Sequence, residues 1–505
     1  MKRPSCPTCS RPGQDADGSP GAAQRDAIGA PMIFTRRRFL QQAGAFSALS
    51  LAGSLDMLGL SSASAQAGDY KALVCLFLFG GNDSNSMVLP YSGYASYDAV
   101  RPLATGVNVA QSLLTPIAPA NLPGQTFALH PAFTATNGNA TLTSLFQTGR
   151  VAVVCNAGTL VEPLTRAEYR ARSKKAPSQL FSHSDQQQQY QTSNSEANVL
   201  TAPTGWGGRV GDRVAAMNGP LATPIGMSFS GSQTFLNGDS VRGLALPTAG
   251  NFGYTGDSAT PNAVQIARAN ARSEMILATD ANAMVSSAQS AMTGALNASQ
   301  KINPVLNGTL PTSISTPFNG LNSGLANQLR AVARLINNRV SLGQRRQIFF
   351  VSIGGFDTHS GQGQFQPPTG AIAGVASLYQ QIGQAMSAFY QSTVNMGVAN
   401  DVTTFMLSDF NRTFKPNGAG TDHAWGGHYL VMGGGVQGGR FYGQYPTLAL
   451  GGPDDADSLG RWVPTTSIEQ YGATLARWFG VPDVDIAQVF PGVNRFATSN
   501  LGFMT

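Results

Sequence analysis

The chain has 505 residues, 11% of them charged, and a formal net charge of +6 at pH 7. With 42% hydrophobic residues, this composition excludes an intrinsically disordered chain and indicates a large globular fold. No long block of Lys and Arg follows the first 65 residues, which argues against a nucleic-acid partner.

The N-terminal region reads as an export signal. Residues 35–40, Thr-Arg-Arg-Arg-Phe-Leu, form a twin-arginine motif, and an apolar stretch over 43–60 precedes an Ala-x-Ala cleavage site at 63–65. We therefore assign residues 1–65 to the signal, with Met32 as a possible true start. Since no later segment is long and apolar enough to span a bilayer, we expect a periplasmic or secreted protein, exported folded by the twin-arginine machinery.

The four cysteines do not suggest a disulfide framework. Cys6 and Cys9 lie upstream of the export motif, where a Cys-x-x-C pattern carries little weight. Cys75 and Cys155 each lie inside an apolar run, so we expect buried thiols. A bridge between them stays possible if their runs are neighbouring strands.

Three mainly apolar runs, at 71–79, 348–353 and 402–407, are typical of central strands in a parallel sheet. Helical spacing between the last two runs favours strand-helix-strand alternation, and hence an α/β fold with a mainly parallel sheet. We expect one domain over 66–505, with an insertion around 205–345 that caps the site. Each run leads into a glycine-rich loop that carries an aspartate, namely Asp83, Asp357 and Asp409.

These loops predict a metal site, because the carboxyl ends of parallel strands meet at one edge of a sheet. The sequences Asp357-x-His359 and Asp422-His423 add imidazole ligands beside strand ends. A dinucleotide site is not supported, since the loop after the first run lacks the G-x-G-x-x-G spacing. All five histidines are expected in loop-like segments: His130, His183, His359, His423 and His428.

A second polar stretch, Ser182-His183-Ser184-Asp185, opens a predicted helix. These residues could cap the helix and do nothing more, or present a nucleophile and a metal ligand where backbone amides favour anions. The preceding segment, 160–180, is basic. It is either a solvated helix or, as the less favoured interpretation, a rim that attracts an anionic substrate.

Four motifs carry a resemblance to a known family. The segments GGNDSNSMVLPY, SHSDQQ, GGFDTHSGQ and SDFNRTFKPNGAGTDHAWGGHYLVMGGGVQGG resemble the bacterial family called domain of unknown function 1501, across most of 70–495. That family is placed in the alkaline phosphatase-like superfamily, with sulfatases and phosphoglycerate mutases. The resemblance implies a three-layer α/β/α fold and, in active relatives, two divalent metal ions that act on phosphate or sulfate esters.

Carried over residue by residue, the resemblance makes Ser182 and Ser184 candidate nucleophiles and Arg412 a candidate clamp for the ester's oxygens. Arg412 could equally form a salt bridge that holds its loop. One departure is Phe410, where relatives have histidine. The metal, expected to be Zn, Mn, Fe or Ca, would be held by Asp83, Asp357, His359, Asp409, His423 or His428, and His183.

Two functions remain open on this basis. The first is an exported metal-dependent hydrolase of phosphate or sulfate esters, for which the converging Asp and His residues argue. The alternative is a non-catalytic exported binding or surface protein that retains the fold, which Phe410 and the unsettled nucleophile favour. An exported redox enzyme ranks last, because haem, iron–sulfur and dinucleotide motifs are missing from the sequence.

Overall fold

The computed structural model describes residues 69–196, 204–219, 223–253, 260–278, 280–363 and 372–505, so the predicted signal region with Cys6 and Cys9 lies outside it. A nine-stranded sheet forms the centre, with strand order β10-β4-β9-β8-β1-β7-β5-β6 and β11 beside β4. Only β9 pairs antiparallel, with β4 and with β8, so the predicted α/β class and mainly parallel sheet are confirmed. The strands are β1 Lys71–Leu78, β4 Val151–Gly158, β5 Gly226–Ser228, β6 Leu244–Ala245, β7 Arg346–Ile353, β8 Val402–Ser408, β9 Gly427–Gly433, β10 Phe441–Tyr442 and β11 Thr466–Ser467, besides a separate pair, β2 Val88–Pro90 and β3 Phe127–Leu129.

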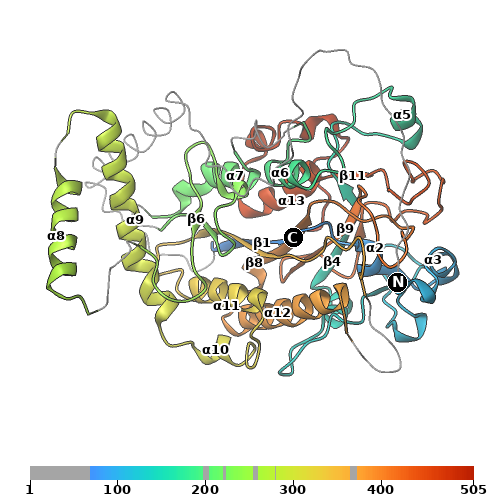
Figure 1. The fold of residues 1–505 in the computed structure, drawn as a ribbon, viewed down its shortest axis with the longest axis horizontal. Helices are drawn as coiled ribbons and strands as arrows, with labels where there is room; N and C mark the ends of the chain where they lie inside the picture. The colour runs from blue at the N-terminus through green and yellow to red at the C-terminus, as the bar shows by residue number, and fades with distance from the viewer. Residues whose placement is uncertain (1–68, 197–203, 220–222, 254–259, 279, 364–371) are drawn as a thin grey trace, which may run out of the picture.

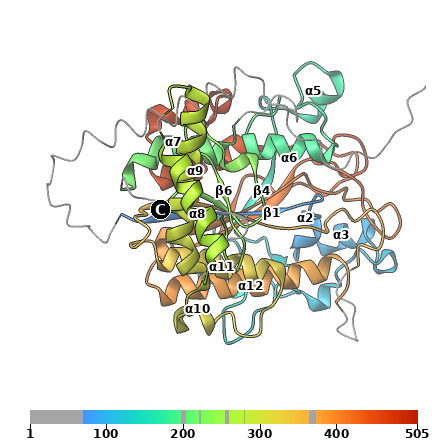
Figure 2. The same cartoon turned by 60° about the vertical axis from the view of Figure 1, so that its left-hand side comes forward.

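Helices cover both faces of this sheet (Figures 1 and 2). One face carries α6, α7 and α13, and the other carries α11 and α12. Contacts of α13 with β1 and of α11 with β7 join these layers to the sheet. The helices are α2 Ser84–Met87, α3 Tyr94–Val100, α4 Leu142–Gln147, α5 Arg166–Ala171, α6 His183–Thr192, α7 Trp206–Val214, α8 Ala263–Leu277, α9 Ala283–Asn307, α10 Thr312–Ser315, α11 Gly324–Asn337, α12 Val375–Asn395, α13 Ile468–Phe479 and α14 Ile486–Val489.

The central strands are buried on both faces, which explains their mainly apolar sequences. In β1 every residue after Lys71 is buried, and the strand pairs in parallel with β7 on one side and β8 on the other. Cys75 on β1 and Cys155 on β4 are free, buried thiols, as expected. A bridge between them is excluded here because β8 and β9 lie between their strands.

One edge of the sheet gathers the polar loops. The parallel strands β1, β7 and β8 all end there, and β9, which runs the other way, begins there. Helix α6 packs against β8 and starts with His183. Five segments therefore meet at this edge: the loops after β1, β7 and β8, the loop before β9, and the N-terminus of α6.

The segment 205–345 was expected to be a capping insertion. Its two strands, β5 and β6, extend the main sheet, and its helix α11 packs on β7 and α12. Helices α8 and α9 of the same segment project beyond the β6 edge (Figure 1). Whether any of this segment covers the site stays a prediction. Among the described helices, none has both the length and the apolar character needed to cross a membrane.

Candidate metal centre

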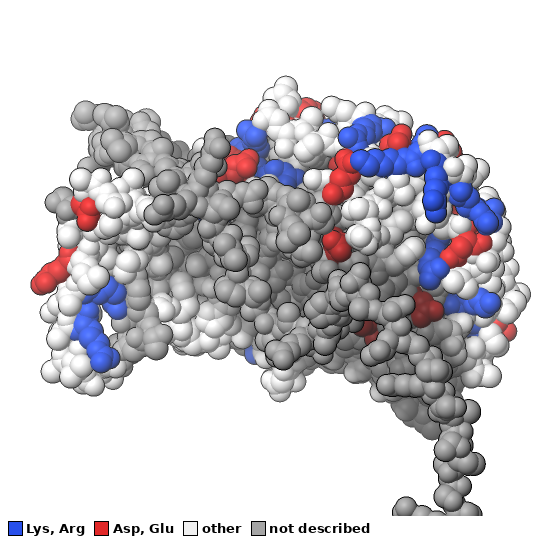
Figure 3. Space-filling view, turned by 45° about the horizontal axis from the view of Figure 1, so that its top comes forward, with Lys and Arg blue, Asp and Glu red and all other residues white. Residues whose placement is uncertain are grey.

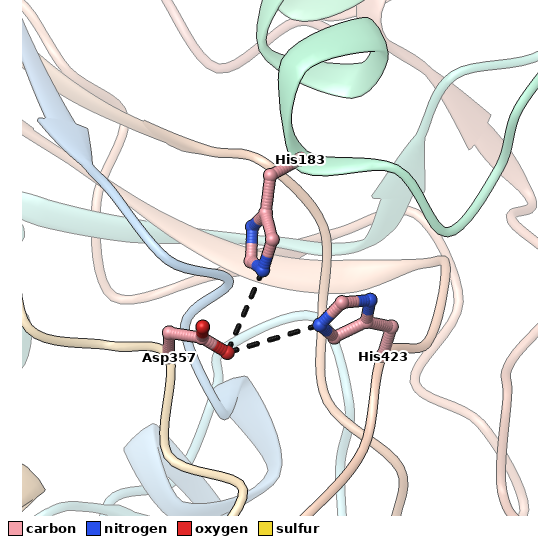
Figure 4. Close-up of side chains that lie close together, drawn as sticks. All are labelled: His183, Asp357 and His423. Atoms are coloured by element: carbon pink, nitrogen blue, oxygen red, sulfur yellow. Dashed lines mark ion pairs between the residues drawn. The ribbon is translucent and has the colours of Figure 1, made fainter. Parts of the chain in front are cut away.

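Three side chains from distant parts of the chain converge at the polar edge of the sheet (Figure 4). His183 comes from the first turn of α6, Asp357 from the loop after β7, and His423 from the loop before β9. Asp357 Oδ1 lies 3.5 Å from His183 Nε2 and 3.8 Å from His423 Nε2. One ligand atom from each of the three residues lies within 4.8 Å of the others.

A fourth residue, His359, lies beside this set. Its Nε2 is 3.2 Å from Asp357 Oδ1 and 2.8 Å from His423 Nε2. We call His183, Asp357, His359 and His423 the histidine centre. Its members are reachable from solvent, since the side chains of Asp357 and His359 are 53% and 46% exposed.

The opposite nitrogen of each imidazole in the histidine centre is fixed by an oxygen acceptor. His183 Nδ1 lies 2.7 Å from Asp409 Oδ2, and His359 Nδ1 lies 3.0 Å from Asp422 Oδ1. His423 Nδ1 lies 2.8 Å from the carbonyl oxygen of Phe181. Carbonyl and carboxylate oxygens only accept, so each Nδ1 carries the hydrogen.

In a neutral imidazole that tautomer leaves a lone pair on Nε2. Three such lone pairs therefore face one carboxylate oxygen, and those of His359 and His423 lie only 2.8 Å apart. Lone pairs at this separation repel unless a proton or a cation lies between them. Imidazoles held through Nδ1 by carboxylates or carbonyls, with Nε2 turned inward, are the arrangement found at protein metal sites.

Asp409 supports the centre from behind. It is fully buried, and its Oδ2 accepts from His183, from Gly80 N at 3.1 Å and from Gln187 Nε2 at 3.0 Å. Its Oδ1 and the Nε2 of His183 have no hydrogen-bond partner among the described residues. Two buried atoms with unused lone pairs are what a bound cation would satisfy.

Arg412 holds the loops together from inside the protein. Its buried guanidinium donates to Asp357 Oδ1 at 2.5 Å and to the carbonyl oxygens of Gly80, Gly81, Phe356 and Thr421. Burial raises the pKa of Asp357, but the hydrogen bond and charge of Arg412 outweigh burial and leave it below its ordinary value. This placement matches the loop-holding alternative for Arg412, since its donors are directed at the protein itself.

The two candidate serines flank His183 of the histidine centre in the sequence. Ser182 Oγ donates to Asp185 Oδ2 at 2.6 Å and lies 3.3 Å from Ser184 Oγ. The same segment contacts the centre a second time through Phe181, whose carbonyl oxygen accepts from His423 Nδ1. A nucleophilic role for either serine stays a prediction.

Asp83 does not join the histidine centre. Its carboxylate is buried and forms an ion pair with Arg101 at 2.7 Å. Ser86 Oγ and Gln362 Nε2 also donate to it, at 2.7 and 2.6 Å. We call Asp83, Arg101, Ser86 and Gln362 the arginine cluster. Burial raises the pKa of Asp83, and the charge and hydrogen bonds of Arg101 more than offset this.

His428 also lies outside the centre. It is on β9 and fully buried, so the prediction that all histidines lie in loops is wrong for this residue, as it is for His183, the first residue of α6. Its Nδ1 accepts from the backbone N–H of Asn156 at 3.2 Å, and its ring stacks on Tyr445. His130 has the same bond direction, because its Nδ1 accepts from Ala132 N at 3.1 Å. The bond at Nδ1 therefore divides the histidines into three of the ligand type and two of the structural type.

The surface near α5 carries charges of both signs, with basic residues in excess between residues 160 and 180. Figure 3 shows Lys and Arg side chains gathered at one end of the molecule, interleaved with Asp and Glu. Lys174 pairs with Glu168 at 2.9 Å, and Lys175 pairs with Glu196. The basic segment 160–180 thus agrees better with a solvated surface than with a rim that attracts anions.

Sequence reasoning gave no role to an acidic and a basic residue that shape this region, Asp422 and Arg101. Asp422, which fixes His359, stands directly before His423, so its position beside a ligand was the available signal. Arg101 follows α3 and has no motif around it, so nothing in the sequence connects it with Asp83. Phe410 was noticed as a departure from the family pattern; its ring packs against both His183 and His423, with centroids 4.7 and 4.5 Å away.

Comparison with known proteins gives a family. The sequence profile of the family described as "Protein of unknown function (DUF1501)" matches residues 70–456, and the chain belongs to that family. The matched part includes the histidine centre and the arginine cluster. No curated protein matches the chain.

Proposed function

We propose that this member of the DUF1501 family is an exported, metal-dependent hydrolase of phosphate or sulfate esters. The observation that carries the proposal is the shared direction of three imidazoles, which turn Nε2 toward Asp357 while acceptors hold Nδ1. A divalent ion would be held by His183, Asp357 and His423, with His359 as a further ligand. Three imidazoles and one carboxylate favour Zn, Fe or Mn over Mg or Ca.

The surrounding residues have supporting roles in this proposal. When bound, such an ion polarises the ester and lowers the pKa of a water molecule, which makes hydrolysis feasible near neutral pH. Asp409 and Asp422 orient two imidazoles, and Arg412 keeps the Asp357 carboxylate ionised and in place. The exposed side of Asp357 and His359 leaves the ester a way in.

Two parts of the proposal, the ester class and the route of export, rest on the family resemblance and on the N-terminal sequence. Helices on both faces of a mainly parallel sheet agree with the alkaline phosphatase-like classification that the family resemblance implies. Members of that superfamily act on phosphate and sulfate esters. The twin-arginine motif at 35–40 supports export of the folded chain to the periplasm or beyond.

One observation favours the alternative, a non-catalytic exported protein that binds a metal. His359 Nε2 lies only 2.8 Å from His423 Nε2, so the histidine centre can supply four protein ligands. Four-coordinate sites made entirely of protein ligands are usually structural, whereas catalytic sites keep one position open. Whether His359 binds the ion or stays beside it separates the two functions.

The test begins with the metal content of the mature protein, purified without chelator. We expect about one Zn, Fe or Mn per chain in the wild type and in Glu274→Gln, an exposed control on α8, and none in His423→Ala. The same samples are then assayed with aryl phosphates and aryl sulfates. A folded wild type that refuses all three metals contradicts the proposal, whereas a metal-loaded protein without esterase activity favours the alternative.

A further inference from the structure

The structure separates two acidic loops that a two-metal enzyme would use together. The family resemblance implies two ions, with Asp83 among their ligands. Asp83 and Asp357 follow neighbouring parallel strands, β1 and β7, at the same edge of the sheet. Only Asp357 faces imidazole lone pairs, and the two carboxylates differ in what they can still bind.

The Asp83 carboxylate has no acceptor capacity to spare. Its Oδ2 accepts from Arg101 Nη1, Ser86 Oγ and Gln362 Nε2, at 2.7, 2.7 and 2.6 Å. Its Oδ1 accepts from Arg101 Nη2 and Asn85 Nδ2, at 3.1 and 3.2 Å. An ionised carboxylate offers about four lone-pair sites, and five donors already share them. A metal ion could bind only by displacing several of these donors.

Arg101 is held firmly in place. The guanidinium is fully buried, and beyond Asp83 it donates to the carbonyl oxygens of Phe414 and Thr413, at 2.7 and 2.8 Å. It also packs over the rings of Tyr97 and Phe414, 5.9 and 5.2 Å from their centroids. A forked, bidentate guanidinium–carboxylate pair of this kind is among the strongest charge pairs in proteins. Removing the guanidinium to admit a metal would leave a buried charge unpaired.

His428, expected as the alternative to His423 among the metal ligands, cannot bind an ion in this arrangement. His428 Nδ1 accepts the N–H of Asn156, so its lone pair is in use and the hydrogen of the neutral ring is on Nε2. The backbone N–H of His428 also donates to Ser84 Oγ at 2.9 Å, which fixes the strand beside the loop of Asp83. Neither ring nitrogen of His428 therefore presents a lone pair to an ion.

We infer that the loop after β1 binds no metal because the Arg101 guanidinium is its permanent cation. Resting on the function proposed above, this makes the protein a one-ion hydrolase, with the ion at the histidine centre alone. The arginine cluster then has a positioning role and holds no Lewis acid. It fixes the loop after β1, and the Gly80 N–H of that loop donates to Asp409.

The experiment locates the ions directly in the wild-type protein. Crystals of the full mature chain are soaked in Zn²⁺ and, separately, in Mn²⁺, and anomalous difference maps are compared with the ion count in solution. We expect one peak, at the histidine centre, and Asp83 still paired with Arg101. A second peak within coordination distance of Asp83 overturns the inference.

Matched substitutions give an independent answer. Asp83→Asn should leave the ion count unchanged, whereas Asp357→Asn should abolish ion binding. If Asp83→Asn lowers the count from two to one, the inference is wrong while the hydrolase proposal stands. If no ion binds anywhere in the wild type, the hydrolase proposal fails, and the statement that Asp83 binds none is upheld.

Discussion

The histidine centre and the arginine cluster are built from similar sequence but end in opposite states. Asp83 and Asp357 each follow a buried strand and a pair of glycines, and each contacts an arginine. The Asp83 side chain is fully buried with Arg101, whereas the Asp357 side chain is 53% exposed. A glycine loop with an aspartate therefore predicts a polar site, while the neighbouring loops decide whether it is a closed ion pair or an open centre.

The histidines show the same contrast in another form. His423 donates from Nδ1 to a carbonyl oxygen and turns a lone pair toward Asp357. His428, five residues later, accepts at Nδ1 from a backbone N–H and packs inside the protein. The direction of one hydrogen bond separates a ligand from a structural residue, which neither the residue type nor its place in the motif reveals.

The largest difference between the two regions should be the loss in free energy of unfolding when the aspartate of each is replaced by asparagine. Asp83→Asn leaves the buried Arg101 without its counter-charge, and breaking a buried pair from one side costs about 3–5 kcal/mol. Asp357→Asn should cost only about 1 kcal/mol, because Asp357 is half exposed and Arg412 keeps its carbonyl partners. Urea unfolding of both variants, with chelator present, measures this difference. Equal losses would mean that the two carboxylates are equally part of the folded framework.

The next largest effect concerns the residues that orient the imidazoles. Asp409→Asn and Asp422→Asn each weaken the acceptor at an Nδ1, and loss of such a partner lowers metal affinity by roughly 10- to 100-fold. Competition with a fluorescent chelator gives the affinity, with Glu274→Gln as the control of unchanged affinity. Unchanged affinity in both variants would show that the imidazoles do not bind the ion through Nε2.

Much of this arrangement could be predicted from the sequence. Mainly apolar runs identified β1, β7 and β8, and the rule that parallel strands end at one edge brought Asp357, His359 and Asp409 together. The antiparallel direction of β9 could not be predicted, because an apolar run carries no sign of its direction. Likewise β5 and β6, with three and two residues, are too short for periodicity to be recognised.

Which residues belong to each site was harder to predict than the sheet edge at which the sites lie. Asp83 looked like a metal ligand because its local sequence is like those of Asp357 and Asp409. Its partner, Arg101, reaches it only through the path of the chain over α3, and no local pattern encodes that path. Hydrogen-bond direction at a histidine is likewise a property of tertiary contacts, so His428 and His423 could not be told apart.

The smallest effect is expected in the pH dependence of stability, to which the buried His428 contributes. Burial lowers the pKa of His428 to about 3, from an ordinary 6.5. The unfolded chain therefore binds a proton that the folded chain does not, between these two values. This contribution to stability is complete above pH 6.5 and declines as the pH falls toward 3, by about 2 kcal/mol at pH 5. Replacing His428 by Asn, which keeps an acceptor near the N–H of Asn156, should remove that decline.

His183 provides the opposite sign within the same protein. Its hydrogen bond to Asp409 raises its pKa, so its contribution is present below pH 6.5 and is lost as the pH rises above that value. Urea unfolding of the metal-free wild type and of His428→Asn at pH 5 and pH 7 separates the two effects. The free energy of unfolding of the wild type minus that of His428→Asn should be about 2 kcal/mol smaller at pH 5 than at pH 7. A constant difference between the two proteins would mean that His428 is not the buried, neutral histidine that distinguishes the closed region from the open centre.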